Sequence, residues 1–526
     1  MKICLPEGFR HPIELKPLSP RLGDLKDKKI CFFFSWQAGT LYDGSFANRL
    51  KELFEKEGAQ CVFKWKRRAF DQNDPEERKE IGIEFDAVIY FGASSCSTSK
   101  YAAVYGGYLD SFEKIPTVAV TYQTFVPDCE HANFDNGTRT RCVFTDYPGD
   151  LLGDDKIQIA FEGIKRGLTE TLREQEKQSG LFNFPPPHET VDVPDPQNYL
   201  FASHLTDGNP VVIPTPERIE KMLKGTSLSP TRVVAERIWP NCSYATVRTI
   251  AIIATMAGLP PKAMAAACAI AKAYSDAPGQ ALVVSTNSFG FLPILKGKVV
   301  KDLELNFSEH AMSSVPGKLN APLGRFLRLL QIAIGGWRQG ENAFGVIGNP
   351  MLGCPVVAEN PEYTNGKEST ITLLTGCWSY FGNYMNMDFQ SLIDMAKHCD
   401  YQTGLFCVIS PKRADELIQQ FGSLEKAAAH YQENSKVSLE EFWEKQDWHK
   451  VFTKPQLELG SGQGELQGYP KDYLDYFKNK KELKDKMVPA FPKGGIRFVV
   501  SGGNASKMLR AIHGAPVSCV SISDFQ

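Results

Sequence analysis

The residue most suggestive of chemistry in this chain is Cys96, which lies in a predicted strand–turn–helix. The apolar run 87–91 predicts a buried strand that ends at Gly92. We expect a helix to begin at about Ser97 or Thr98. Cys96 would then lie where unpaired backbone N–H groups and the helix dipole favour negative charge. Such a thiol is expected to be acidic and to react as a thiolate.

The hydroxylated residues of this turn allow two interpretations. In the first, Ser94, Ser95, Ser97 and Thr98 cap the helix, and Cys96 only fills space. In the second, the same four residues bind substrate, because ligands of open α/β sheets bind at strand-to-helix turns.

Nucleophilic catalysis by Cys96 would need a base and an oxyanion hole. The neighbouring backbone N–H groups would form the oxyanion hole. Among the nine histidines, His131 is the nearest candidate base, because the loop after a predicted strand at 117–121 should end near Cys96. Cys129 could instead serve as a resolving thiol. Histidines and cysteines in exposed loops commonly have no catalytic role. The alternative interpretation is therefore that His131 and Cys129 take no part in chemistry.

A second group of polar residues flanks a segment with six glycines between positions 335 and 353. The group consists of Asn320, Arg325, Glu359 and Asn360. Amide, guanidinium and carboxylate groups beside a glycine-rich loop suit recognition of a small polar or anionic substrate, with Glu359 as a catalytic candidate. Alternatively, Arg325 pairs with Glu359 to tie a helix to a strand.

Two further turns carry candidate substrate-binding residues. Asn287 and Ser288 follow a predicted strand at 281–285, where they could equally be ordinary turn formers. Near the C-terminus, a turn is expected between a strand at 497–501 and a helix that ends near His513. Its backbone N–H groups could hold a phosphate or carboxylate. The residues singled out there are Gly502, Gly503 and Asn504.

The elements that would position these residues predict an α/β protein. In the first third of the chain, strands alternate with helices, which is typical of a parallel sheet covered on both faces. The order fits a flavodoxin-like or similar open sheet, whose ligand site lies beyond the carboxyl ends of the strands. The expected strands are 29–34, 59–64, 87–91 and 117–121, and a last helix is expected at 156–176.

A segment rich in proline, 178–199, divides the chain into two predicted domains. The first, 1–177, is the open parallel sheet, and the second, 200–526, is a larger mixed α/β domain with glycine-rich loops. The helices expected in the second domain are 216–223, 244–256, 261–274, 321–334, 388–398, 411–421, 424–431 and 438–445. The strands expected there, besides 281–285 and 497–501, are 354–358, 369–375 and 517–522.

Composition restricts the class of partner. The net charge is −2 without a long basic run, so no nucleic-acid partner is expected. The start of the chain shows no export signal, and no apolar run could span a bilayer, so no membrane partner is expected. The thirteen scattered cysteines indicate free thiols in a cytoplasmic protein. No metal-ligand spacing is present, no cofactor can be named, and an alanine-rich helix at 261–274 makes a homo-oligomer plausible.

Several stretches resemble a selenoprotein-related family named for its Sec-Gly-Ser-Cys (UGSC) motif. They are LSPRLGDLKDKKI, GASSCSTS and IPTVAVTYQTF in the first domain. DGNPVVIPTPERIEKML, NAPLGRFLRLLQIAIGG and GNPMLGCPVVAENPE resemble a large segment found with that domain in bacterial members. The resemblance implies thiol-based chemistry. However, Ala93 stands at the Sec position of the motif, so a redox pair with Cys96 cannot form within this loop.

Three functional hypotheses follow. The first is a thiol-dependent enzyme, a transferase, lyase or oxidoreductase, that acts through Cys96 on a small polar or sulfur-containing organic substrate. The second is a non-redox hydratase or lyase in which Glu359 acts with Asn320 or Asn287. The third is a metabolite-binding protein without turnover.

Overall fold

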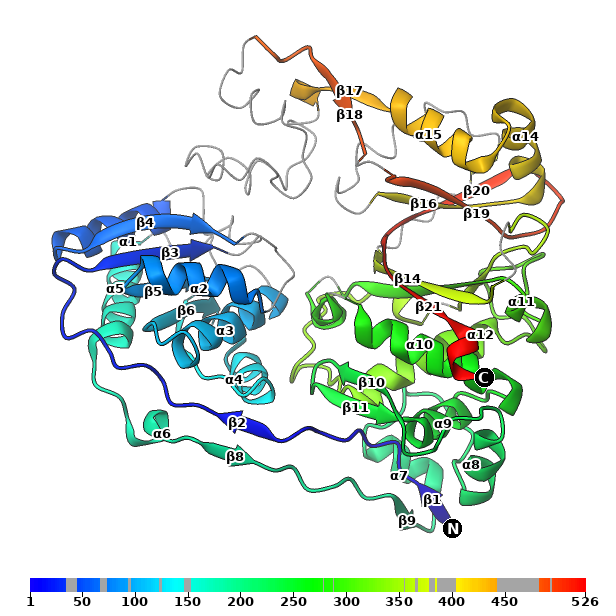
Figure 1. Cartoon of the computed structure of the whole chain (residues 1–526), viewed down its shortest axis with the longest axis horizontal. Helices are drawn as coiled ribbons and strands as arrows, with labels where there is room; N and C mark the ends of the chain where they lie inside the picture. The colour runs from blue at the N-terminus through cyan, green and yellow to red at the C-terminus, as the bar shows by residue number, and fades with distance from the viewer. Residues whose placement is uncertain are drawn as a thin grey trace. The chain divides into compact units, whose positions relative to one another are not determined.

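The chain forms two compact units, which are described one at a time (Figure 1). Unit 1 comprises Met1–His11, Pro185–Val437 and Pro489–Gln526, and unit 2 comprises Pro12–Phe184 and Ser438–Val488. This is a computed structural model. It describes residues 1–34, 45–66, 73–92, 96–122, 125–145, 153–277, 279–286, 288–353, 355–364, 368–377, 384–385, 404–441, 482–491 and 494–526.

Unit 2 contains a five-stranded parallel sheet, which confirms the predicted open sheet. Its strand order is β4-β3-β5-β6-β7, the 2-1-3-4-5 order of flavodoxin-like folds. The strands are β3 (Lys29–Phe34), β4 (Gln60–Trp65), β5 (Ala87–Phe91), β6 (Thr117–Tyr122) and β7 (Arg141–Thr145). All five residues of β5 are buried, as expected for a strand covered on both faces.

Helices cover both faces of this sheet. Phe32 packs on Phe54 of one helix, whereas the next residue along the strand, Phe33, packs on Tyr105 of another. Since successive side chains of a strand point to opposite faces, these two helices lie on opposite sides. The described helices of unit 2 are α1 (Ser45–Lys56), α2 (Pro75–Glu84), α3 (Cys96–Ser111), α4 (Val126–Asp135), α5 (Asp154–Thr169) and α6 (Glu174–Lys177).

A buried ion pair holds the segment before β3 against α3. Arg21 donates hydrogen bonds to both carboxylate oxygens of Asp110 at 2.7 Å, and both side chains are almost fully buried. Asp110 also accepts hydrogen bonds from the backbone N–H groups of Ser19 and Thr117. The carboxylate is therefore surrounded by donors, and the segment is an integral part of unit 2.

The predicted linker 178–199 contains regular structure at both ends. In unit 2, β2 (Ile13–Leu15) pairs with β8 (Gly180–Phe182). In unit 1, β1 (Lys2–Cys4) pairs with β9 (Thr190–Asp192), which is followed by α7 (Pro196–Ala202). Each end of the predicted linker thus pairs with an N-terminal strand inside its own unit.

Unit 1 is built on two four-stranded mixed sheets, ordered β13-β12-β14-β21 and β15-β20-β16-β19. The apolar residues between them include Ile294, Phe406 and Val499. The first sheet consists of β12 (Gly290–Lys296), β13 (Val357–Ala358), β14 (Thr370–Cys377) and β21 (Ala515–Ser521). The second consists of β15 (Tyr384–Met385), β16 (Leu405–Ile409), β19 (Ile496–Val500) and β20 (Met508–His513). A further pair is β10 (Val233–Ile238) with β11 (Ser243–Thr246). β17 (Lys436–Ser438) pairs with β18 (Met487–Pro489), and the boundary between the units falls within both of these strands.

Several helices of unit 1 match their predicted bounds. The described helices are α8 (Pro216–Leu223), α9 (Val247–Met256), α10 (Met264–Asp276), α11 (Val299–Asp302), α12 (Asn320–Leu329), α14 (Pro411–Phe421) and α15 (Leu424–Asn434). The alanines of α10 are buried within unit 1, where the helix packs on β10 and β21. Their abundance is therefore explained by packing inside one chain.

Three predicted elements of unit 1 are wrong or displaced. The predicted strand 281–285 lies in a 3-10 helix, because a short buried apolar run does not distinguish strand from helix. The predicted helix ending at His513 is the strand β20, which pairs antiparallel with β16. The helix expected from Tyr244 begins only at Val247, since the preceding residues pair in β11. The predicted helix 388–398 and residues 442–445 of the predicted helix 438–445 lie outside the described residues, and Ser438 belongs to β17.

Candidate functional site

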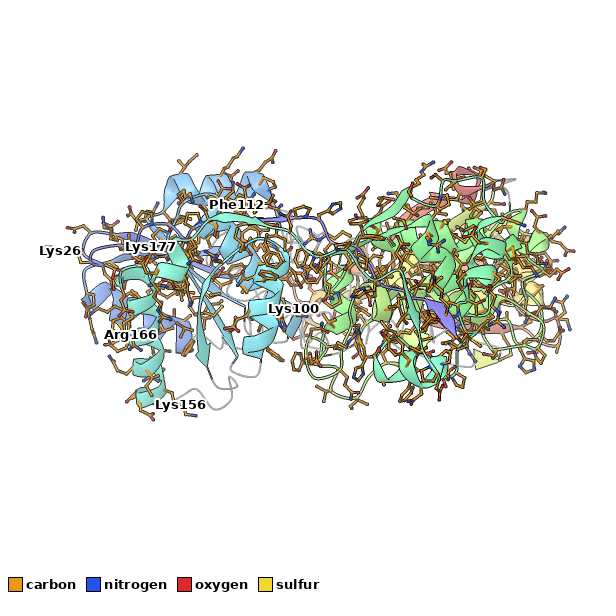
Figure 2. All side chains as sticks on the ribbon, turned by 90° about the horizontal axis from the view of Figure 1, so that it is seen from below. Lys26, Lys100, Phe112, Lys156, Arg166 and Lys177 are labelled. Carbon is orange, nitrogen blue, oxygen red and sulfur yellow. The ribbon has the colours of Figure 1, made fainter. Side chains whose placement is uncertain are left out.

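The backbone around Cys96 has the predicted strand–turn–helix geometry. β5 ends at Phe91, and Cys96 is the first residue of α3. β4 pairs with one edge of β3 and β5 with the other, so the strand order reverses at β3. The carboxyl ends of β3 and β5 therefore form the switch point at which open α/β sheets bind ligands. Lys100, one helical turn further along α3, is 1 % exposed (Figure 2).

The polar residues near Cys96 are only partly described. Ser94 and Ser95 lie outside the described residues, and of Cys96, Ser97 and Thr98 only the backbone is described. The segment predicted to be a loop after β6 is instead the helix α4, which packs on α3. His131 is exposed on this helix, and Cys129 is fully buried. Burial removes Cys129 from the solvent that an exchanging thiol needs.

Two of the candidates near the glycine-rich segment have structural partners. The Asn320 side chain is buried, accepts a hydrogen bond from the backbone N–H of Asn306 and donates to the carbonyl oxygens of Asn306 and Val356. Arg325 makes a bidentate ion pair with Asp207 at 2.9 Å. The suggested pairing of Arg325 with Glu359 is therefore wrong, because the guanidinium is already engaged by an acid far earlier in the sequence.

The other two predicted binding turns, at 287–288 and 502–504, give no support for ligand binding. Asn287 lies outside the described residues, and Ser288 is buried with a φ of 51°. The turn with Gly502, Gly503 and Asn504 joins two strands, so the expected helix N-terminus does not exist there. A side chain at Gly503 would meet the carboxylate of Glu309. This acid disfavours a phosphate or carboxylate at the turn.

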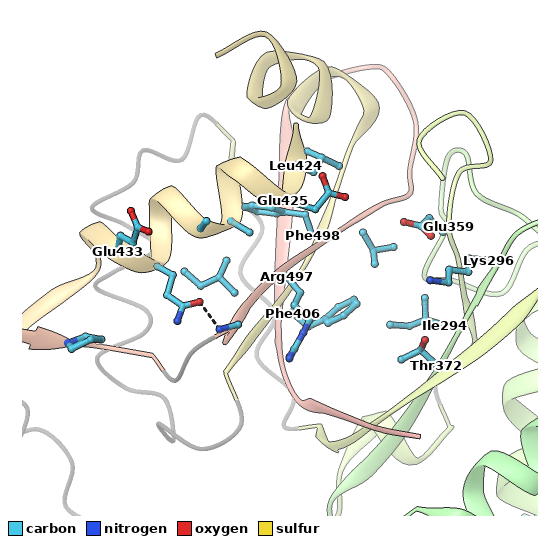
Figure 3. Close-up of a pocket in the computed structure, with 17 residues that line it drawn as sticks. Ile294, Lys296, Glu359, Thr372, Phe406, Leu424, Glu425, Glu433, Arg497 and Phe498 are labelled. Carbon is cyan, nitrogen blue, oxygen red and sulfur yellow. Dashed lines mark hydrogen bonds between the residues drawn. The ribbon is translucent and has the colours of Figure 1, made fainter. Parts of the chain in front are cut away.

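A cavity of about 770 Å³ lies in unit 1, between α15 and strands of both sheets (Figure 3). β12 and β14 contribute Ile294 and Thr372, which are paired across the sheet and share one face. β16 and β19 contribute Phe406 and Arg497, which are also paired. The charged residues that line the cavity are Lys296, Glu359, Glu425, Glu433 and Arg497.

Glu359 is the one predicted site residue among those described around this cavity. It follows β13, and backbone bonds hold it on both sides. The N–H of Glu359 donates to the Leu295 carbonyl oxygen at 2.8 Å, and the N–H of Asn360 donates to that of Val500 at 2.7 Å. Ser501 Oγ donates to the carbonyl oxygen of Ala358 at 2.8 Å. The first of these bonds ties Glu359 to β12, and the other two join the end of β13 to the end of β19. Together they fix the backbone position of Glu359.

The electrostatics of the cavity favour proton exchange at Glu359. Burial raises the pKa of this carboxyl above its ordinary value, Lys296 and the Thr364 hydroxyl oppose the rise, and the negative charge of Glu425 adds to it. In Figure 3, Glu359 and Lys296 lie near each other, and Glu425 projects from α15. A carboxyl group with a raised pKa in a concave site is suited to general acid–base catalysis.

Sequence reasoning missed the residues that accompany Glu359. Lys296 ends a strand that was not predicted, and Glu425 lies on a helix that was predicted without a role. Arg497 had a signal of its own, because it is a charge within the apolar run IRFVV of β19. Among the described residues, no group of three or more His, Cys, Asp or Glu could hold a metal ion.

Comparisons with known proteins give no identity. No family model matches the chain, and no curated protein matches it. No described helix combines the length and apolar character needed to cross a membrane.

Proposed function

We propose that unit 1 acts on a small organic acid in the cavity beside α15, with Glu359 as the residue that takes and returns a proton. The observation that carries this proposal is a partly buried carboxyl with a raised pKa, held by bonded strand ends, on the wall of a cavity. In its ionised form Glu359 would remove a proton from carbon next to a carbonyl or carboxyl group. The electrons of that C–H bond would form a carbon–carbon double bond as a hydroxyl group leaves the next carbon with its bonding electrons. The hydroxyl would take up the proton from Glu359 and depart as water, which is hydratase or lyase chemistry.

Isotope exchange tests this proposal on a whole class of candidate substrates at once. The whole chain would be incubated in ²H₂O with four- to six-carbon 2-oxo and hydroxy acids, and loss of C–H signals followed by ¹H NMR. Wild type should exchange a proton on at least one acid, and Glu359→Gln should be slower by a factor of roughly 10²–10⁴. Glu362→Gln, a nearby acid outside the cavity lining, is the matched control. Equal exchange in wild type and Glu359→Gln would rule the proposal out.

A second candidate function is thiol chemistry at Cys96. It is favoured by the position of Cys96 as the first residue of a sixteen-residue helix at the switch point of the unit 2 sheet. The resemblance to the Sec-Gly-Ser-Cys family supports the same chemistry, and a small sulfur-containing substrate remains part of this proposal. A cytoplasmic location is proposed on the cysteine content. The homo-oligomer stays a prediction.

A further inference from the structure

The arginine on the wall of the unit 1 cavity, Arg497, differs from three other arginines that are partly or fully withdrawn from solvent. Arg21 and Arg325 each make a bidentate ion pair with an aspartate. Arg141 binds both oxygens of Glu176 and several carbonyl oxygens besides. Arg497, in contrast, makes no hydrogen bond or ion pair with any described residue. Its charge is not compensated by the part of the protein that the structure describes.

The lack of a described partner is notable because the Arg497 side chain is partly withdrawn from solvent. It lies in β19 opposite Phe406, is only partly exposed and lines the cavity. Burial lowers the pKa of Arg497, and no neighbouring acid among the described residues offsets the effect. Withdrawing a cation from water without a partner is costly, so such a group commonly marks the place of an anion.

Apolar residues share the lining of the cavity with Arg497. Phe406 and Ile496 lie beside it on the strands, and Leu424 and Ala428 of α15 also line the cavity. Of these, Phe406 and Ile496 are almost fully buried. Pockets of this kind bind the apolar body of a ligand through such walls and orient it through a few polar groups.

We infer that the cavity binds an amphipathic monocarboxylate, with its carboxylate on the guanidinium of Arg497 and its hydrocarbon chain against Phe406 and the neighbouring apolar wall. The guanidinium would donate two parallel hydrogen bonds to the carboxylate oxygens. Lys296 at the end of β12 and Glu359 just after β13 also line the cavity, and the reacting carbon would be placed beside them. This inference deepens the proposed function and rests on it for the reaction, although the binding contacts are independent of Glu359.

The acids of the cavity make a cationic ligand the principal competing occupant. Glu425 and Glu433 both line the cavity from α15, and neither forms an ion pair with a described residue. An ammonium group could therefore be attracted to them. Ligands that share one hydrocarbon chain and differ only in their head group separate the two possibilities.

The test is calorimetric titration of the whole chain with hexanoate, hexylamine and 1-hexanol. Hexanoate should bind, and the amine and the alcohol should bind at least tenfold more weakly. In Arg497→Gln, hexanoate binding should weaken by a factor of roughly 10 to 100, since a charge-assisted hydrogen bond is lost. Arg497→Lys keeps the positive charge but loses the planar guanidinium with its paired donors. Its affinity for hexanoate should lie between those of wild type and Arg497→Gln. Arg218→Gln, which changes an exposed arginine on α8, is the control.

The outcomes separate the inference from the proposed function. Hexanoate binding that is equal in wild type and in both folded Arg497 variants would overturn the inference, as would preference for hexylamine or a lack of hexanoate binding by wild type. Binding that depends on Arg497 and persists in Glu359→Gln supports it. If hexanoate binds in this way but no acid exchanges a proton, the ligand class stands and the proposed reaction fails. If an acid exchanges a proton but hexanoate does not bind, the proposed reaction stands and the inferred ligand class fails.

Discussion

Ser501 Oγ donates a hydrogen bond to the carbonyl oxygen of Ala358, 2.8 Å away, and thereby joins the end of β19 to the end of β13. Both residues are almost fully buried, so the bond is protected from water. Glu359 follows Ala358 directly, and Arg497 lies four residues before Ser501. Together with the backbone bond from Asn360 to Val500, this side-chain bond joins the strand that supplies the proposed anion anchor to the strand that precedes the proposed acid–base residue.

Removal of this hydroxyl should affect the cavity. Ser501→Ala leaves the buried carbonyl oxygen of Ala358 without this donor, and we expect the free energy of unfolding to fall by about 1–3 kcal/mol. Proton exchange by Glu359 should slow as well, because the carboxyl is less firmly held. Ser518→Ala is a matched control, since Ser518 Oγ donates to the carbonyl oxygen of Ala273 at the same 2.8 Å. If both variants lose stability equally and Ser501→Ala keeps full exchange, the positioning role is refuted.

The raised pKa of Glu359 predicts a specific pH dependence of stability. An acid whose pKa is higher in the folded than in the unfolded state adds stability at low pH, and this contribution is lost as the pH rises through the folded pKa. Glu359→Gln, which cannot ionise, should not show this loss. The difference in free energy of unfolding between variant and wild type should therefore shift in favour of the variant from about pH 4 towards neutrality. Urea titrations over this range measure it, and a constant difference would contradict the raised pKa.

The ion pair of Arg325 and Asp207 should contribute to stability and not to ligand binding. Its bidentate geometry and partial burial predict that Asp207→Asn lowers the free energy of unfolding by about 1.5–3 kcal/mol. In Glu220→Gln, which breaks the more exposed pair with Arg248, the loss should be below about 1 kcal/mol. Hexanoate titration of Asp207→Asn should match wild type. Weakened hexanoate binding would make Arg325 a candidate ligand-binding residue again.

Thiol reactivity distinguishes the two interpretations of Cys96. A thiolate favoured by the start of α3 should alkylate at lower pH than an ordinary exposed cysteine. Cys519 is exposed and provides that reference within the same chain. Iodoacetamide labelling followed by mass spectrometry at each site would measure both rates across pH. Identical pH profiles for Cys96 and Cys519 would favour the capping and space-filling interpretation.

The sequence was most informative where local signals agree with one another. The strand before Cys96 combines an apolar run with a terminal glycine, and α8 has a proline in its first turn, so both were predicted at their observed bounds. β20 was missed because its pairing with β16 depends on residues a hundred positions away.

The candidate site of unit 1 could be predicted only in part, for a similar reason. Glu359 was recognised as a polar residue beside a glycine-rich segment, but so were Asn320 and Arg325, whose partners are structural. Side-chain type does not show whether a polar group faces a cavity or a buried backbone carbonyl. Arg497 carries a sequence signal as a charge within an apolar run, but only the structure shows that it has no partner among the described residues.

A crystal structure of the whole chain with bound hexanoate tests the central claim most directly. We predict density for the ligand in the cavity beside α15, with its carboxylate within hydrogen-bond distance of Arg497 and its chain on the side of Glu359. An empty cavity, with hexanoate bound instead beyond the carboxyl ends of β3 and β5 near Cys96, would contradict the account and favour the thiol-centred alternative.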